Sequence, residues 1–135
     1  MRIVFDTNCL LRVLPVNSPY RYLWDAFLRG DFELCYTTEI LHEYEEILSR
    51  FYSTAVAKYA VGVLMKAPNT NKITPHFSWN LITADPDDNK FVDCALNANA
   101  DYIVTNDKHF NVLKSIDFPL IKVMGIMEFQ QMLKQ

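Results

Sequence analysis

The segment 85–107, DPDDNKFVDCALNANADYIVTND, constrains the fold more than any other part of the chain. Its opening Asp-Pro pair suits the N-cap and the first position of a helix, and apolar residues then recur at helical spacing as far as Ala98. The run 102–105 (YIVT) consists of strand-forming residues and ends just before Asn106 and Asp107. The segment therefore predicts a helix followed by a short buried strand.

Acidic residues stand at both ends of this predicted unit. Asp88 lies one turn before Val92 and two turns before Ala95. It therefore falls on the buried face of the helix, at the N-terminal end of that face. Asp87 and Asp93 are expected on the solvent side. Asp107 follows the C-terminal end of the strand. Because helix N-termini and strand C-termini meet at one edge of a parallel α/β sheet, the segment predicts half of an acidic site.

Helices and strands alternate along the rest of the chain. Strands are predicted at 2–6, 32–36 and 119–124, and helices at 20–28, 38–51, 53–66, 110–114 and 126–134. Residues 9–13 fit a helix or a loop, and 69–83 is expected to be an irregular loop with brief extended stretches at 72–74 and 81–82. This alternation predicts an α/β fold in one domain, residues 1–135, with helices on both faces of a mostly parallel sheet.

The composition excludes several classes of protein. A net charge of −3 gives no overall basic field, so nucleic acid would have to be bound by a local patch, by metal ions or with another chain. Only three glycines are present, which excludes a phosphate-binding loop or a dinucleotide fingerprint. Three unpaired cysteines, no signal peptide and no apolar run of membrane length favour a cytoplasmic protein without a membrane segment.

Two further acids are expected at the same sheet edge. Asp6 ends the first predicted strand. Glu43 lies early in the helix that follows the second strand, at the border of an apolar stripe that runs from Ile40 to Phe51; Glu39 and Glu46 compete with it on spacing alone. Taken singly, each acid has an ordinary interpretation as a turn residue, a helix cap or a solvated edge. Their convergence is what would make a site.

Several carboxylates within a few ångströms cannot all stay ionised without a counter-charge. Oxygen ligands of this kind suit Mg²⁺ or Mn²⁺, whereas the cysteines lie outside the cluster and argue against a zinc or thiolate site. A cation held this way leaves positions for water and a substrate phosphate and makes bound water easier to deprotonate. The sequence therefore predicts a divalent cation held by carboxylates.

At these residues the chain resembles a known family. The motif IVFDTN at 3–8, the acid Glu43 and the segment 85–107 are similar to those of PIN-domain ribonucleases, most closely the VapC-like toxins of toxin–antitoxin pairs. The resemblance spans essentially the whole chain, and 85–107 is its most specific part. It implies a three-layer α/β/α fold and a Mg²⁺- or Mn²⁺-dependent endoribonuclease that hydrolyses RNA with a metal-activated water.

The resemblance also assigns roles to individual residues. The four catalytic and metal-binding acids would be Asp6, Glu43, Asp88 and Asp107. Asn8, Thr105 and Asn106 would orient carboxylates or a metal-bound water. The implied partners are an RNA substrate, an antitoxin protein and a second copy of the chain in a homodimer.

Basic residues near the acids are candidates for binding RNA phosphates, and solvated surface charge is the alternative for each. They are Lys90, Lys108, Arg12 and Arg50. His109 is near Asp107 but is expected on the surface. The aromatic stripe Tyr20, Trp24 and Phe27 is expected in the core or at an oligomer contact, and could also receive an antitoxin helix.

Two other functions compete with the nuclease. The domain could bind RNA or protein without turnover, although the presence of all four acids argues against this. It could also transfer phosphoryl groups with Asp6 as nucleophile, as some folds with an acid after the first strand do. That chemistry requires a second acid two residues after Asp6, where this chain has Asn8.

Overall fold

A parallel β-sheet forms the centre of the protein, which the computed structural model describes over residues 1–135. The five strands lie in the order β3-β2-β1-β4-β5, and every neighbouring pair is parallel. Their bounds are Arg2–Phe5 (β1), Glu33–Tyr36 (β2), Thr70–Lys72 (β3), Tyr102–Val104 (β4) and Val123–Met124 (β5). The predicted α/β fold is therefore confirmed, with a fully parallel sheet.

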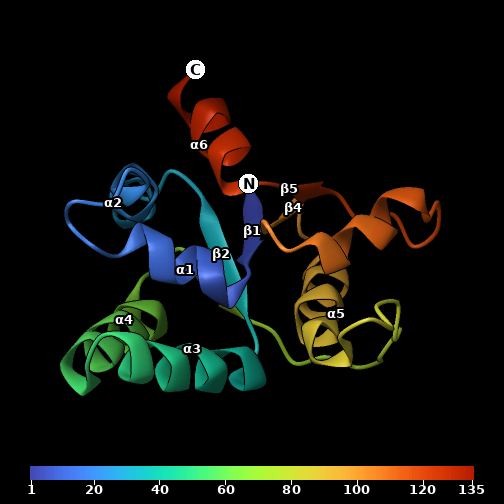
Figure 1. Cartoon of the computed structure of the whole chain (residues 1–135), viewed down its shortest axis with the longest axis horizontal. Coiled ribbons are helices and arrows are strands. Elements are labelled where there is room, and N and C mark those ends of the chain that lie inside the picture. The colour runs from blue at the N-terminus through green and yellow to red at the C-terminus, as the bar shows by residue number, and fades with distance from the viewer.

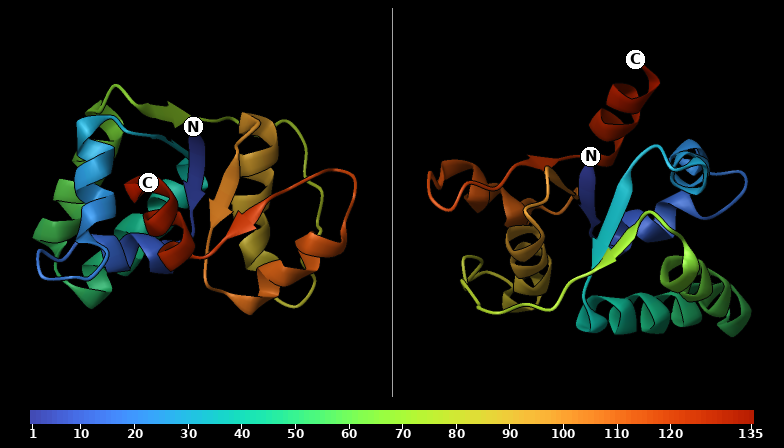
Figure 2. Two further views of the ribbon diagram at one scale, coloured as in Figure 1. Left: turned by 90° about the horizontal axis from the view of Figure 1, so that it is seen from above. Right: turned by 180° about the vertical axis from the view of Figure 1, so that it is seen from behind.

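Helices cover both faces of this sheet. They are Thr7–Val13 (α1), Arg21–Arg29 (α2), Thr38–Phe51 (α3), Thr54–Lys66 (α4), Asn89–Ala98 (α5) and Ile126–Lys134 (α6), with 3₁₀ turns at Pro86–Asp88 (η1) and Lys108–Ser115 (η2). Figures 1 and 2 show α5 on one face and α1, α2 and α6 on the other, with the α3–α4 hairpin beside α1. None of the helices is long and apolar enough to cross a membrane.

Local signals in the sequence set the helix ends. The Thr37 hydroxyl accepts a hydrogen bond from the Ile40 N–H at 3.1 Å and begins α3, as an N-cap does by satisfying a free backbone donor. The helix α2 ends at Gly30, whose φ of 86° is a left-handed conformation that glycine adopts without strain. Asn99, with φ 52°, ends α5 in the same conformation.

Buried aromatic rings fix β1 between its neighbours. Phe5 packs edge to face on Phe32 and on Phe129 of α6, with ring centroids 6.0 and 6.1 Å apart. Phe32 and Phe129 in turn lie 5.1 Å apart. Edge-to-face pairs of this kind add to the stabilisation from apolar burial. Because Phe5 is the last residue of β1, the cluster also holds the strand end from which Asp6 emerges.

A few predicted elements differ from the observed ones. Residues 9–13 belong to a helix, and the last strand is restricted to Val123–Met124, because Pro119 and the residues around it lack ladder partners. Phe51 was expected to face inward, and this was wrong: it is 64% exposed at the end of α3. The stretch 73–85 contains no helix or strand.

Candidate functional site

Two neighbouring strands bring Asp6 and Asp107 to one edge of the sheet. Asp6 directly follows β1, and Asp107 lies three residues after β4, which pairs with β1 in parallel. The Thr105 hydroxyl joins them: it donates to Asp6 Oδ2 at 2.7 Å and accepts from the Asp107 N–H at 3.0 Å. Thr105 therefore sits where it orients one predicted acid and the backbone of another.

The 3₁₀ turn η1, which leads into α5, brings Asp88 to the same place. The Asp85 side chain accepts from the Asp87 N–H at 3.2 Å and caps η1, with Pro86 in its first position, so the Asp-Pro start acts as predicted. Phe91 of α5 packs on Phe110 of η2 with ring centroids 6.4 Å apart. This contact holds the start of α5 beside the turn that begins after Asp107.

Asp88 is the least satisfied acid of the cluster. The residue is only 9% exposed, and its Oδ2 is buried without a hydrogen-bond partner. The pKa of Asp88 is raised to about 6, chiefly by burial and then by the charges of Asp85, Asp107 and Asp6, while His109 lowers it. Ionising this carboxyl group therefore costs more than usual, and a nearby cation would offset that cost.

Asp6 is buried as deeply but is better supported. It is 6% exposed. Burial raises its pKa, the Thr105 hydroxyl and the Asn8 backbone N–H lower it, and the charges of Asp107 and Glu43 raise it. Asp6 and Asp107 share the hydroxyl of Thr105, and Asp107 and Asp88 each have an oxygen 3.4 Å from His109 Nδ1. These contacts gather three of the predicted acids at one edge of the sheet.

Glu43 enters the cluster from α3 and has a complete set of partners. The Thr7 hydroxyl donates to Glu43 Oε2, and Lys90 Nζ lies 2.6 Å from Glu43 Oε1. The next residue, Tyr44, donates its hydroxyl to the Phe5 carbonyl and ties α3 to the end of β1. Glu43, rather than Glu39 or Glu46, is thus the α3 acid that lies at the site.

Lys90 differs from its expected position. Its side chain is 7% exposed and pairs with Asp87 at 2.9 Å as well as with Glu43. Burial would lower its pKa, but hydrogen bonds and charge from Glu43 and Asp87 raise the pKa overall. The ammonium group is therefore a buried counter-charge for Glu43 and is not free on the surface to bind RNA. The sequence pattern shows the charge of Lys90 but not its burial.

His109 is exposed, as expected, and its ring also lies beside two of the acids. Its Nδ1 lies 3.4 Å from Asp88 Oδ2 and 3.4 Å from Asp107 Oδ1. The position follows from a local signal: Asp107 Oδ1 accepts from the His109 N–H at 2.9 Å and caps η2. The cap explains why the backbone of His109 lies near Asp107, whereas the direction of the imidazole depends on packing that the sequence pattern does not report.

A pocket opens beside Asp6 and Asp107. Its volume is about 360 Å³, and its lining residues are Asp6, Asn8, Cys9, Leu11, Arg12, Asn106 and Asp107. Asn8 and Arg12 are exposed residues of α1 at this opening. The Asn106 side chain is used elsewhere, because its Oδ1 accepts from the Ile126 N–H at 3.1 Å and anchors the start of α6.

The remaining candidates lie outside the cluster. Lys108 is exposed next to Asp107, whereas Arg50 pairs with Glu46 at 2.9 Å, two turns along α3 from Glu43. Asp93 was expected on the surface, and this was wrong: it is 8% exposed, because its Oδ1 accepts from the Trp79 N–H at 3.1 Å and holds the loop before α5.

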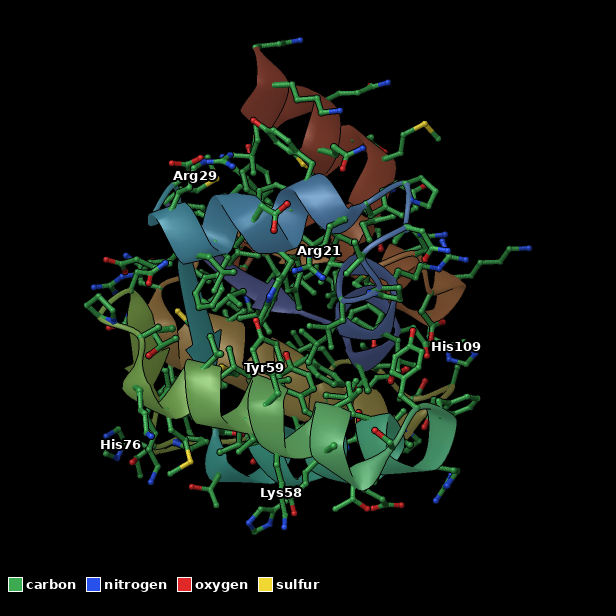
Figure 3. All side chains as sticks on the ribbon, turned by 90° about the vertical axis from the view of Figure 1, so that its left-hand side faces the viewer. Arg21, Arg29, Lys58, Tyr59, His76 and His109 are labelled. Atoms are coloured by element: carbon green, nitrogen blue, oxygen red, sulfur yellow. The ribbon has the colours of Figure 1, made fainter.

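The predicted aromatic stripe is part of the core. Trp24 and Phe27 are fully buried, and the Trp24 ring N–H donates to the Tyr59 hydroxyl at 3.2 Å. Figure 3 shows Arg21 of α2 and Tyr59 of α4 pointing into the space between these two helices. The interpretation of the stripe as core is therefore confirmed, and the stripe does not form an open groove.

The donor set fits a divalent cation. Carboxylate oxygens dominate it, with one imidazole, and none of the three buried, free cysteines belongs to the group of donors that could hold a metal ion. The buried Asp88 Oδ2, which has no hydrogen-bond partner, supplies a ligand atom whose desolvation a cation would offset. Oxygen-rich sites of this kind bind hard cations such as Mg²⁺ and Mn²⁺.

Known proteins resemble the chain in sequence pattern and in fold. The family model described as PIN domain matches residues 2–109. Among solved structures, a chain in the crystal structure of VapBC2 from Rickettsia felis bound to a DNA fragment from their promoter is similar, with a TM-score of 0.64 and 14% sequence identity; the match covers 93% of this chain and 98% of that chain. No curated protein sequence matches significantly. At 14% identity the structural likeness shows the fold alone.

Proposed function

The chain belongs to the PIN-domain family, as its sequence motifs indicate, and from this premise we propose that it is a divalent-cation-dependent endoribonuclease, the toxin of a toxin–antitoxin pair. The observation that carries the proposal is the set of contacts that gathers Asp6, Asp88 and Asp107 around Thr105 and His109 at one sheet edge. Glu43 contacts Thr7, the residue after Asp6, and a buried Asp88 oxygen has no hydrogen-bond partner. Four such carboxylates are costly to ionise together, and cation binding offsets that cost.

Asp6, Asp88 and Asp107 would hold the cation, with Glu43 beside them. Bound Mg²⁺ or Mn²⁺ would supply Lewis acidity toward a phosphodiester and lower the pKa of water in the site. The protein itself contributes orientation: Thr105 fixes the Asp6 carboxylate, and the Asp107 cap fixes the start of η2. Groups held by such hydrogen bonds need no reorganisation when substrate arrives.

Two exposed cations border the acids where a negatively charged backbone would approach. Arg12 lines the pocket beside Asp6 and Asp107, and Lys108 is exposed next to Asp107. Contacts from Arg and Lys to phosphate position nucleic acid without reading its sequence. With a net charge of −3 the protein has no long-range basic field, so we expect RNA binding to depend on these two side chains and on the cation.

Isosteric substitution of two acids tests the proposal. D6N and D88N should each lower Mn²⁺-dependent cleavage of a labelled RNA by more than about 100-fold, since loss of groups that merely orient metal ligands already costs 10- to 100-fold. Circular dichroism should show an unchanged fold. D117N, which changes an exposed acid, is the matched control and should cleave normally.

Full cleavage by both D6N and D88N would refute the nuclease. Absence of cleavage in the unmodified protein, with RNA still bound, would instead support the alternative of a silent RNA-binding domain. The RNA used should be a mixed total RNA, because nothing in the four-acid cluster reads base identity.

We further propose an antitoxin partner, a homodimer and a cytoplasmic location. The structurally similar VapBC2 is crystallised as a complex with promoter DNA. Exposed apolar side chains favour protein contacts. Val16 is 83% exposed and Phe51 is 64% exposed. Size-exclusion chromatography with light scattering, with and without the product of the adjacent gene, tests the two assemblies.

The cytoplasmic location is supported by the cysteines, which are buried and unpaired, as is usual in a reducing compartment.

A further inference from the structure

We propose that Asp85, Asp88 and His109 form a cation subsite with the imidazole nitrogen as a direct ligand, and that this subsite favours Mn²⁺ over Mg²⁺. The inference deepens the proposed function and rests on it only for the claim that the cation serves cleavage. Its basis is a group of donors that shares Asp88 with the four acids and adds Asp85 and His109. One donor atom from each of the three residues lies within 4.8 Å of the others.

The unpartnered Asp88 oxygen points to a missing ligand in this group. Asp88 Oδ2 is buried without a hydrogen-bond partner, and it is the atom that His109 Nδ1 faces at 3.4 Å. Unsatisfied buried carboxylate oxygens are rare, because each costs the free energy of desolvation. A cation between Asp88 Oδ2 and His109 Nδ1 would satisfy both atoms.

The observed spacing suits coordination. Ligands about 2.1 Å from an octahedral ion lie about 3.0 Å apart when adjacent and about 4.2 Å apart when opposite. The Asp88–His109 separation of 3.4 Å is close to the adjacent value, and no two donor atoms of the group lie more than 4.8 Å apart.

The three side chains are held ready for this role from different elements. Asp85 is fixed by its cap on η1, which uses Oδ1 and leaves the other oxygen available. The Asp107 cap draws the His109 backbone toward the site. The His109 side chain is 43% exposed and Asp88 is nearly buried, so a hydrated ion could enter from the His109 side and lose part of its water at Asp88.

The imidazole is what distinguishes the two ions. Mg²⁺ takes oxygen ligands almost exclusively and keeps several waters. Mn²⁺ also prefers oxygen, but as a first-row transition ion it accepts an imidazole nitrogen more readily than Mg²⁺ does. A site made only of Asp6, Asp107 and Glu43 has no nitrogen donor. His109 is therefore the residue expected to set the ratio of Mn²⁺ to Mg²⁺ affinity.

Electron spin-echo spectroscopy of bound Mn²⁺ tests direct coordination without reference to activity. The unmodified protein with one equivalent of Mn²⁺ should show modulation from a directly bonded nitrogen-14, which changes to the nitrogen-15 pattern when histidine is isotopically labelled. H109A should lose the signal. H76A is the matched control, since Figure 3 places His76 and His109 at opposite edges of the molecule, and it should keep the signal.

Calorimetric titration then measures selectivity. H109A should bind Mn²⁺ at least about tenfold more weakly, the lower bound for loss of a group that supports a metal site, and should bind Mg²⁺ within about twofold of the unmodified protein. H109D should bind Mg²⁺ more tightly, because it replaces nitrogen by oxygen. D85N, which retains a capping oxygen, should weaken Mn²⁺ binding with the fold unchanged.

The outcomes separate the subsite from the proposed function. Absence of nitrogen modulation in the unmodified protein, or equal loss of Mn²⁺ and Mg²⁺ affinity in H109A, overturns the subsite, even where RNA is cleaved and D6N abolishes cleavage. Nitrogen modulation that depends on His109 supports the subsite, even where no RNA is cleaved and the nuclease proposal fails.

Discussion

The acidic site has two halves that satisfy their charges in opposite ways. In the paired half, Glu43 accepts from Thr7 and contacts the buried ammonium of Lys90. In the open half, Asp88 has three acids and a histidine around it and a buried oxygen without a partner. Both halves lie at the same sheet edge, yet only one of them contains its own cation.

The difference between the halves indicates where an external cation is needed. Lys90 supplies to Glu43 the positive charge that a metal ion would supply to Asp88. It also suggests distinct uses: the paired half maintains the fold around the site, and the open half carries ion binding.

Removing the internal cation should have the largest effect. K90M leaves Glu43 partly buried beside other acids without its counter-charge, and we expect a loss of about 3 kcal/mol in the free energy of unfolding, at the low end for a broken buried pair because Glu43 retains some exposure. Urea denaturation measures it. K108M, at an exposed lysine, is the matched control and should cost less than about 0.5 kcal/mol. A loss below about 1 kcal/mol in K90M would show that Glu43 does not need Lys90 as its counter-charge.

The effect of D88N on the free energy of unfolding should change sign when Mn²⁺ is added. In chelator at pH 7.5, D88N should be more stable than the unmodified protein by about 2 kcal/mol, because ionising the native carboxyl is costly there and an Asn amide can donate to neighbouring acids. With Mn²⁺ at 100 times its Kd, the unmodified protein gains about 2.7 kcal/mol and D88N much less. The order of the two unfolding curves should therefore reverse. D88N that stays more stable in Mn²⁺ would place the ion elsewhere.

The same half predicts a pH dependence. The pKa of Asp88 is raised in the folded protein from 3.8 to about 6, so its contribution to stability is fully present below about pH 4 and is lost as the pH rises through about 6. Asp6, whose pKa is also raised, acts in the same direction. Without metal, the stability difference between the unmodified protein and D88N should shift by about 1 to 2 kcal/mol between pH 4 and pH 7. A difference independent of pH would show that Asp88 titrates normally.

Most of the fold could be predicted because its signals are local. Periodic apolar residues and caps at Thr37, Gly30 and the Asp85-Pro86 pair define the main helices, and alternation of strands with helices leads to a parallel sheet. The exceptions are residues whose neighbours are distant in sequence. Phe51 fits the stripe of α3 but extends past the last element that could cover it.

The site could be predicted only as a set of acids. Strand ends and helix phase identify Asp6 and Asp88, because these depend on backbone periodicity. The partners of these acids are set by the packing between α3, α5 and η2. The spacing of residues along the chain does not predict that packing. That is why Lys90 was expected on the surface but pairs with Glu43, and why the carboxylate of Asp93 holds a loop instead of facing solvent.

The smallest expected effect separates the two partners of Glu43. T7V removes the hydroxyl that donates to Glu43 Oε2 but leaves Lys90 in contact with Oε1. Because the charge stays compensated, only one hydrogen bond to a charged group is lost, and we expect about 1 kcal/mol in the free energy of unfolding, measured by urea denaturation. T38V, at an exposed threonine in the first turn of α3, is the matched control. Combining T7V with K90M should cost more than the sum of the two, because Glu43 then loses both supports; simple additivity would show that Thr7 and Lys90 stabilise α3 independently of that carboxylate.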